Sequence, residues 1–211
     1  MNATAIVPVK RLATAKQRLG REAKGRAALV AAMLEDVLEA VGEARMVERA
    51  LVVTSDPVAE RIATASGAEV VRDPSDEGHP QAALMGIDRA VELGATCVAL
   101  LPGDCPLLDP RELDSLLSAT GERHVAIVPD RHGTGTNGLI LAPPDAIRPA
   151  FGEGSRRRHV EAARAAGIPH YVEEVPSLAL DLDTPADLIA LTRELESGRG
   201  SAPRTAKALG I

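Results

Sequence analysis

Apolar residues in this chain gather in short runs that predict β-strands. The runs are rich in Val, Ile and Leu and are bounded by Pro, Gly, Asp or Ser, which is typical of strands buried in a sheet. We expect strands over residues 4–9, 50–54, 68–71, 97–101, 124–128, 137–142 and 170–175.

Longer segments rich in Ala, Leu and Glu separate most of these strands, and their apolar positions recur at helical spacing. They predict helices over residues 23–41, 57–65, 80–93, 110–119, 156–166 and 185–196. Such alternation is typical of an α/β fold with a mainly parallel sheet and helices on both faces. Only a loop separates strands 124–128 and 137–142, which predicts one antiparallel strand in a mixed sheet.

The length of 211 residues suits one domain, which we expect over residues 1–196. Residues 197–211 are rich in Gly, Ser and Arg and show no apolar period. We expect them to form a flexible C-terminal tail, with a short helix that caps a partner subunit as the alternative.

Composition narrows the classes of function. With a net charge of −6, one Phe, one Tyr and no Trp, the chain lacks the basic field and aromatic platforms of a nucleic-acid binder. No apolar run reaches the ~18–20 residues of a membrane span, and the N-terminus lacks a signal-peptide core. Cys97 and Cys105 make neither a disulfide framework nor a zinc site. We expect a cytoplasmic protein without nucleic-acid or membrane partners.

A carboxylate follows the buried strand 97–101. Asp104 lies between Pro102 and Pro106, which cannot continue a strand ladder. Ligands of open α/β sheets bind beyond the carboxyl ends of the strands, where a carboxylate and substrate phosphates suit Mg²⁺. The alternative is that Asp104 only closes a turn.

Two further carboxylates occur in the segment SLALDLDTPADL, residues 177–188. Asp181 and Asp183 are spaced by two, so in an extended segment both face the same way and repel each other unless a cation lies between them. Thr184 is the expected N-cap of the last helix, and Pro185 its first residue. The alternative is that Asp183 assists the cap and Asp181 is solvated; we favour the metal interpretation.

A cationic cluster follows the first strand in the segment VPVKRLATAKQRL, residues 7–19. Lys10, Arg11, Lys16 and Arg18 arrive at the sheet edge where ligands bind. Lys and Arg suit polyphosphate, although ordinary solvated cations at a helix start are the alternative.

The segment FGEGSRRRHVEAARAAG, residues 151–167, predicts an anion site at a helix start, with Ser155 as the N-cap. Its successive arginines, 156–158, and His159 add positive charge there. Basic residues in a first turn oppose the helix dipole unless an anion compensates them. The loop 133–138 matches G-x-G-x-x-G but leads into a strand, which excludes a Rossmann dehydrogenase. Its backbone N–H groups remain a candidate anion cradle.

In order and spacing, five segments together resemble the phospholactate/phosphoenolpyruvate guanylyltransferases of deazaflavin coenzyme factor-420 biosynthesis. They are VPVKRLATAKQRL, LPGDCPLLDP, PDRHGTGTNGLILAPP, FGEGSRRRH and SLALDLDTPADL. The resemblance covers about residues 3–192. It implies a single-domain nucleotidyltransferase fold of the nucleotide-diphospho-sugar transferase (GT-A-like) type, a three-layer α/β/α sandwich.

The resemblance also implies GTP and Mg²⁺ as co-reactants, a homodimer, and a downstream transferase that receives the product. The implied metal ligands are Asp104, Asp181 and Asp183, and the implied catalytic residues are Lys10, Lys16 and Asp104. The implied phospho-acid ligands are Thr136, Asn137, Gly152 and Ser155. The implied nucleotide ligands are Pro8, Lys10, Arg11, Lys16, Gly78, Pro80 and Gln81, although relatives often carry Asn at the position of Gln81.

Residues and resemblance together predict transfer of GMP from GTP to the phosphate of a small phospho-acid, with phosphoenolpyruvate favoured over 2-phospho-L-lactate. A phosphate monoester has a second pKa of ~6 and is already dianionic at neutral pH, so no general base is required. A molybdenum-cofactor or sugar-phosphate nucleotidyltransferase is one alternative, although those usually carry a Gly-rich loop where this chain has KRLATAK. A catalytically inert nucleotide-binding subunit is the other.

Overall fold

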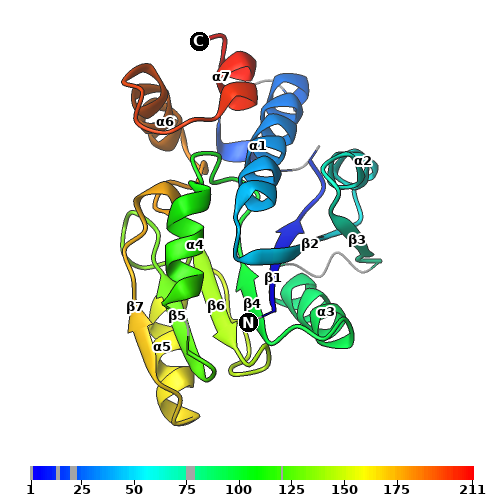
Figure 1. Cartoon of the computed structure of the whole chain (residues 1–211). Coiled ribbons are helices and arrows are strands. Elements are labelled where there is room, and N and C mark those ends of the chain that lie inside the picture. Colours follow the sequence, from blue (N-terminus) through cyan, green and yellow to red (C-terminus); the bar gives the residue numbers. More distant parts are fainter. Residues whose placement is uncertain (1, 13–14, 20–22, 75–78, 120) are drawn as a thin grey trace.

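A single seven-stranded sheet organises the chain, in the strand order β3-β2-β1-β4-β6-β5-β7 (Figure 1). The structure, a computed structural model, describes residues 2–12, 15–19, 23–74, 79–119 and 121–211. The strands are β1 Ala3–Val9, β2 Val47–Thr54, β3 Glu69–Arg72, β4 Cys97–Leu100, β5 His124–Val128, β6 Gly138–Ala142 and β7 His170–Val172.

The sheet is mixed, as the short connection between β5 and β6 predicted. β1 pairs in parallel with β2 and β4, whereas β6 is antiparallel to both β4 and β5. In the β4–β6 ladder Leu100 lies opposite Leu139, and in the β5–β6 ladder Val128 lies opposite Gly138. The first residues of β6 therefore lie at the same sheet edge as the last residues of β1, β4 and β5.

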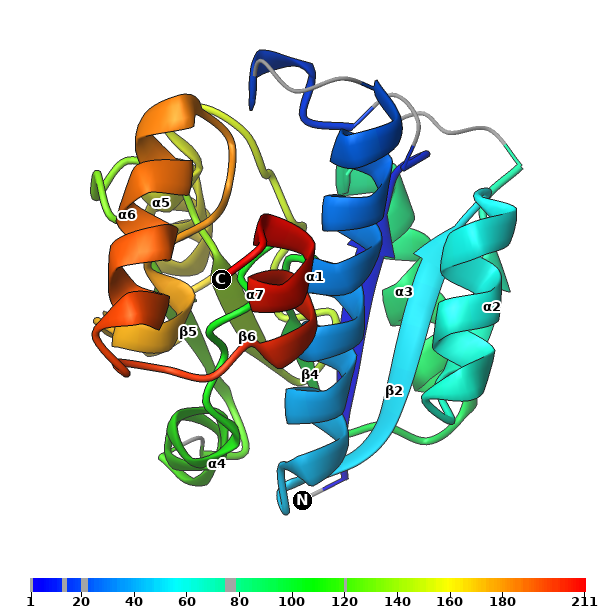
Figure 2. The ribbon, with the colours of Figure 1, turned by 90° about the horizontal axis from the view of Figure 1, so that it is seen from above.

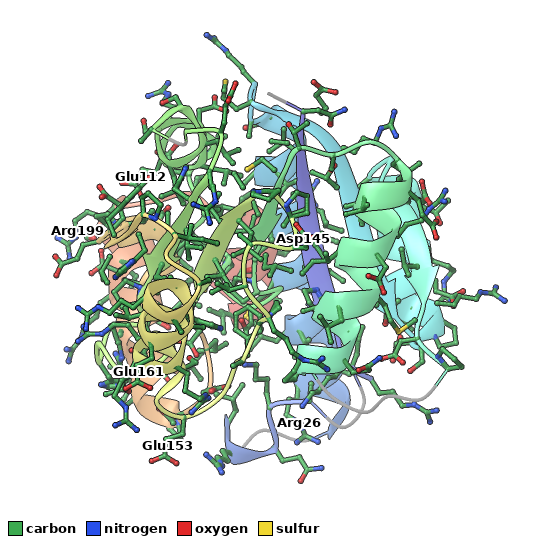
Figure 3. The ribbon with its side chains drawn as sticks, turned by 90° about the horizontal axis from the view of Figure 1, so that it is seen from below. Arg26, Glu112, Asp145, Glu153, Glu161 and Arg199 are labelled. Atoms are coloured by element: carbon green, nitrogen blue, oxygen red, sulfur yellow. The ribbon has the colours of Figure 1, made fainter. Side chains whose placement is uncertain are left out.

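Helices cover both faces of the sheet. They are α1 Ala23–Glu43, α2 Pro57–Ala65, α3 His79–Glu92, α4 Pro110–Ser118, α5 Ser155–Ala165, α6 Pro185–Glu196 and α7 Pro203–Leu209, with 3-10 helices at Gln17–Leu19 and Pro176–Leu178. One apolar core joins α1, α2 and α4 to one face of the sheet (Figure 2). A second joins α3 and α5 to the opposite face (Figure 3). The predicted three-layer α/β/α sandwich is confirmed, and no described helix is long and apolar enough to cross a bilayer.

Local capping signals fixed two helix boundaries. Asp56 caps α2 by accepting from the backbone N–H groups of Val58 and Ala59. Thr184 caps α6 and Pro185 is its first residue, as the Thr-Pro pair predicted, and Thr184 also forms a capping box with Asp187. The predicted N-cap of α5 is wrong: Gly154 is the cap, with φ 69°. Gly154 can adopt this left-handed conformation without strain, which leaves the Ser155 hydroxyl for another contact.

The structure differs from the expected flexible C-terminal tail, because residues 203–209 form α7. Asp36 on α1 accepts from the backbone N–H groups of Arg204 (3.2 Å) and Thr205 (2.8 Å), and so caps α7 from outside. Ala202 belongs to a third apolar core between α1, α6 and α7, and Ala208 and Leu209 pack against this core. The helix therefore packs on α1 of its own chain (Figure 2).

Candidate active site at the carboxyl ends of β1 and β4

A cavity of about 990 Å³ lies at the sheet edge where β1 and β4 end and β6 begins. Predicted site residues from five separate segments line it: Pro8, Lys10, Lys16, Asp104, Thr136, Asn137, Gly152, Ser155, Asp181 and Asp183. Figure 3 shows Glu153, another lining residue, toward the edge of the molecule where Arg26 of α1 also lies. These residues were predicted to lie together because ligands of α/β sheets bind beyond the carboxyl ends of the parallel strands, and they do line one cavity.

One wall of the cavity is acidic and is bridged by a lysine. The Nζ atom of Lys16 pairs with Asp104, and it lies 2.5 Å from Oδ1 of Asp183. Lys16 has φ 55°, an uncommon left-handed conformation for a residue other than glycine. The chain after β1 is therefore turned so that this ammonium group lies between carboxylates from two other segments.

The charges in this wall shift each other's pKa. Burial lowers the pKa of Lys16, but attraction to Asp104 and Asp183 and hydrogen bonds to both raise it above its ordinary value overall. Burial raises the pKa of Asp181, and so do the nearby charges of Asp104 and Asp183, against the opposite effect of a hydrogen bond from Asn137. Burial and two neighbouring carboxylates therefore disfavour the charged form of Asp181.

The predicted metal ligands Asp104, Asp181 and Asp183 line one cavity without forming a closed cluster. Among the described residues no group of three His, Cys, Asp or Glu side chains is gathered closely enough to hold a metal ion. Their chemistry nevertheless fits Mg²⁺, which prefers oxygen ligands and takes few carboxylates together with substrate phosphates. The raised pKa of Asp181 is the observation in favour of this fit, because a cation would relieve the unfavourable burial of its charge.

Asp183 is held in place through its backbone. The carboxylate of Asp187 accepts from the N–H groups of Asp183 (3.1 Å) and Thr184 (2.6 Å). Its other oxygen lies 2.5 Å from Arg131, which belongs to the loop between β5 and β6. The capping box of α6 and this ion pair together fix the segment that carries Asp183.

Asn137 supports the acidic wall, a role that its sequence position did not predict. Its amide nitrogen donates to the carbonyl of Leu178 (2.8 Å) and to Oδ1 of Asp181 (3.2 Å). These bonds direct the amide hydrogens of Asn137 toward the 178–181 segment, although the resemblance implied a phospho-acid ligand. Asn137 therefore joins the start of β6 to the carboxylate of Asp181.

The opposite wall contains hydroxyl groups and a tight turn. Oγ of Ser155 lies 3.1 Å from Oγ1 of Thr136, and that atom lies 3.1 Å from Nδ1 of the buried His159. Gly152 lies in the preceding turn with φ 105°, which strongly favours glycine. This wall offers small hydrogen-bond donors, which suit the anionic groups of a phospho-acid.

Arg158 forms hydrogen bonds with the turn that precedes α5. This differs from the hypothesis that a bound anion compensates the charge of arginines 156–158. The guanidinium group of Arg158 donates to the backbone carbonyl groups of Ala150, Phe151 and Glu153. Arg157, which is exposed, lies 3.8 Å from Glu161 (labelled in Figure 3) one turn later on α5. The positive charge of Arg158 is therefore directed at carbonyl oxygens of its own turn.

Some predicted nucleotide ligands lie away from the cavity wall. Arg11 is exposed, and neither it nor Pro80 and Gln81, in the first turn of α3, is among the lining residues. Gly78 lies outside the described residues. The part of the site predicted to hold the nucleotide base thus stays a prediction.

One residue of this region, Asp130, was missed from the sequence. A second, His159, was predicted to add positive charge at the start of α5, which is wrong because burial lowers the pKa of its imidazole to about 4. Asp130 follows β5 as Asp104 follows β4. Its Oδ1 accepts from the N–H of Thr134 (2.9 Å) and so helps to fix the loop 133–138. His159 follows Ser155 by four residues, a spacing that places two side chains on the same face of a helix and that would have indicated a shared neighbour, which is Thr136. Cys105 is fully buried, which raises the pKa of its thiol well above the ordinary value and leaves it a neutral packing group.

The fold and the cavity together define a class of enzyme. An α/β/α sandwich with lysines and aspartates at the carboxyl ends of its parallel strands is typical of nucleotidyltransferases. The chain belongs to the family described as guanylyl transferase CofC like, whose model matches residues 3–199.

Individual relatives are similar over nearly the whole chain. A phosphoenolpyruvate guanylyltransferase of Conexibacter woesei is 48% identical over 97% of this chain and 94% of its own length. A second, from Sphaerobacter thermophilus, is 40% identical over 95% of this chain and 98% of its own length. The fold is similar to a crystal structure from Desulfovibrio desulfuricans G20 assigned to the nucleotide-diphospho-sugar transferases, with a TM-score of 0.76, 19% identity and coverage of 100% and 95% of the two chains.

Proposed function

We propose that this protein transfers GMP from GTP to the phosphate of phosphoenolpyruvate, with release of pyrophosphate, in the biosynthesis of a deazaflavin coenzyme. The observation that carries the proposal is one cavity with two different walls, an acidic wall bridged by Lys16 and a hydroxyl-bearing wall at Thr136 and Ser155. Membership of the guanylyl transferase family and relatives named as phosphoenolpyruvate guanylyltransferases support the same reaction.

The triphosphate of GTP would lie along the strand ends that carry Pro8, Lys10 and Lys16. Lys16 keeps its proton at neutral pH despite its burial, because attraction to Asp104 and Asp183 outweighs the effect of burial on its pKa, so it can neutralise charge on the departing pyrophosphate. The guanine base would lie toward Gly78, Pro80 and Gln81.

Asp104, Asp181 and Asp183 would hold Mg²⁺, with Asn137 supporting Asp181 through its 3.2 Å hydrogen bond. When bound, the ion supplies positive charge to the phosphate oxygens and orients them. The carboxylates themselves keep the metal-binding wall acidic and rigid, because Asp187 fixes the backbone at Asp183.

The acceptor would bind at Thr136, Gly152 and Ser155. An oxygen of its phosphate attacks the α-phosphorus of GTP and forms a new P–O bond. The bond from the α-phosphorus to the oxygen that bridges it to the β-phosphorus breaks, and its electron pair leaves with pyrophosphate. The attacking phosphate is already largely dianionic, so the residues need only position two anions and neutralise their repulsion.

Pyrophosphate release tests the proposal directly. The purified chain is incubated with Mg²⁺ and GTP, and in separate reactions with phosphoenolpyruvate, 2-phospho-L-lactate or 3-phosphoglycerate. We expect the fastest release with phosphoenolpyruvate, and none above background without an acceptor or with ATP or CTP in place of GTP. Release with sugar 1-phosphates instead would favour a sugar-phosphate nucleotidyltransferase. GTP binding in calorimetry without release for any acid would indicate an inert subunit.

The product, a guanylylated phospho-acid, contains an activated diphosphate linkage, so a downstream transferase that displaces GMP is the class of enzyme that would consume it.

We also propose a homodimer. Light scattering of the purified chain tests this assembly, and a monomeric mass throughout the micromolar range would contradict it.

A further inference from the structure

His159 connects two parts of the cavity wall without lining the cavity itself. The residue is fully buried, and its Nδ1 lies 3.1 Å from Oγ1 of Thr136. That oxygen lies 3.1 Å from Oγ of Ser155, and both hydroxyl-bearing residues line the cavity. Phe151 packs edge-on against the imidazole with ring centroids 5.3 Å apart. The ring therefore has a fixed position behind the hydroxyl groups.

The backbone at Ala150 determines which ring nitrogen carries the hydrogen. The N–H of Ala150 lies 2.8 Å from Nε2 of His159. A backbone amide only donates, so Nε2 is the acceptor and the hydrogen of the neutral ring is on Nδ1. Burial, with a smaller effect of Arg158, lowers the pKa of His159 to about 4, so the ring is neutral at pH 7.

We propose that His159 is a positioning residue that leaves one hydroxyl hydrogen of the Thr136–Ser155 pair free to bind a ligand in the cavity. Nδ1–H and the two hydroxyl groups have three hydrogens for the two contacts between them. One hydrogen is left over, whichever way the hydroxyl groups turn. With the ring hydrogen on Nε2, the two contacts would use both hydroxyl hydrogens and none would remain.

The ligand that this hydrogen suits is an anionic oxygen. A hydroxyl whose acceptor sites are occupied by its neighbours can only donate, and donation to a carboxylate or phosphate oxygen is stronger than to a neutral group. The inference rests on the proposed function, in which this wall binds the acceptor phospho-acid. His159 then controls affinity for the acid and has no contact with GTP.

Two substitutions separate the contacts of His159. In His159→Asn the amide nitrogen lies near the position of Nδ1 and still donates to Thr136. In His159→Gln the amide group lies near the position of Nε2, so it accepts from Ala150 but donates nothing to Thr136. One hydroxyl hydrogen of the Thr136–Ser155 pair is still left over, but an acceptor site of Thr136 is no longer occupied, so that hydrogen is no longer held toward the cavity. His124→Gln is the matched control, because His124 is also buried but lies at the start of β5, at the opposite edge of the sheet.

We expect His159→Gln to raise KM for phosphoenolpyruvate roughly threefold to tenfold, because the hydroxyl hydrogen is no longer held toward the ligand, and to change KM for GTP less than about twofold. His159→Asn should recover most of the acceptor affinity, and the His124 variant should match wild type. Equal effects of the Asn and Gln variants, or equal changes in both KM values, would show a merely structural role and overturn the proposal.

Nitrogen-15 NMR of labelled histidine tests the ring independently of turnover. We expect the His159 signals of the Nδ1–H tautomer at pH 7, and signals of the Nε2–H tautomer would overturn the inference. If wild-type protein releases no pyrophosphate with any phospho-acid, the proposed function fails, and the acceptor-binding part of this inference fails with it. Normal wild-type turnover with an unaffected His159→Gln variant contradicts the inference alone.

Discussion

The ammonium group of Lys16 lies 2.5 Å from the carboxylate of Asp183, and the same ammonium group pairs with Asp104. One lysine near the N-terminus thus joins the end of β4 to the segment before α6. Its left-handed backbone conformation, with φ 55°, is uncommon for a side-chain-bearing residue, and these ion pairs help to hold it. The acidic wall of the cavity is assembled around this contact.

Lys16→Gln removes the charge that bridges the acidic wall. We expect pyrophosphate release to fall roughly 10²–10³-fold, by analogy with the loss of one preorganised electrostatic group in other active sites. Lys207→Gln, an exposed lysine on α7, is the matched control and should keep wild-type rates. A Lys16 variant with a rate within about threefold of wild type would refute its role in transfer.

The raised pKa of Lys16 predicts that its contribution to the transfer rate does not change with pH in the neutral range. Because the pKa of Lys16 in the folded protein is raised, its ion pairs are fully present below the unfolded pKa of ~10.4 and are lost only as the pH rises through the folded value. Deprotonation of Lys16 should therefore cause no loss of the rate at saturating substrate between about pH 7 and 9. A pH–rate profile that falls in this range in wild type, but not in Lys16→Gln, would contradict the expectation.

Asp104→Asn should reduce turnover at least ~100-fold with the fold intact. The side chain of Asp104 is 21% exposed and pairs with Lys16, so the substitution leaves the apolar cores unchanged. Asp145→Asn is the control, because Asp145 is exposed and outside the cavity (Figure 3). Pyrophosphate release and the melting temperature are measured for both variants. Near-normal turnover of the Asp104 variant with Mg²⁺ would exclude Asp104 as a metal ligand.

Local signals explain why much of the fold was predictable. Helices 57–65 and 185–196 were predicted to the residue, because Asp56-Pro57 and Thr184-Pro185 place a cap and a first-turn proline side by side. The start of β2 was missed, since its first residues, from Val47, are charged or partly exposed and carry no apolar run. A helix in residues 197–211 was only the alternative to a flexible tail, because the cap of α7 is Asp36, which is remote in sequence.

The candidate site, like the fold, was predictable only in part. The strand-end rule placed Lys16 and Asp104 in one cavity from short motifs alone. The contacts between its side chains are long-range: Asn137 meets Asp181 from 44 positions away, and Thr136 meets His159 from 23 positions away. Such pairings depend on the register of β6 and the packing of α5, which no local pattern specifies.

Asn137→Ala should weaken both stability and activity. Asn137 is buried, and its loss leaves the Leu178 carbonyl and the Asp181 carboxylate without its donation. We expect a loss of about 1–3 kcal/mol in unfolding free energy, from urea denaturation, and a weaker dependence of the rate on Mg²⁺. Asn2→Ala, near the opposite edge of the sheet, is the control for activity. Unchanged stability and Mg²⁺ dependence would show that the Asn137 bonds contribute little.

His159 should make the protein less stable in mild acid. The folded pKa is about 4 and the ordinary value is 6.5, so below pH 6.5 the unfolded chain takes up a proton that the native state does not. Stability due to neutral His159 is present above pH 6.5 and declines as the pH falls toward 4, by roughly 3 kcal/mol at most. Urea denaturation between pH 7 and 4 measures this slope. His159→Asn should flatten it, and an unchanged slope in that variant would assign the loss to other groups.

Removing the external cap of α7 should destabilise the protein without changing the site. Asp36, 4% exposed, accepts from the first N–H groups of α7, so Asp36→Ala should cost about 1–2 kcal/mol of unfolding free energy, as for other helix caps. Glu39→Ala is the matched control on the same helix: Glu39 pairs with Arg204 but is largely exposed, and such surface pairs contribute at most about 1 kcal/mol. Both variants should keep wild-type KM and kcat at 25 °C, because neither residue lines the cavity. Equal destabilisation by the two substitutions would show that α7 is held by the exposed ion pairs and not by the cap.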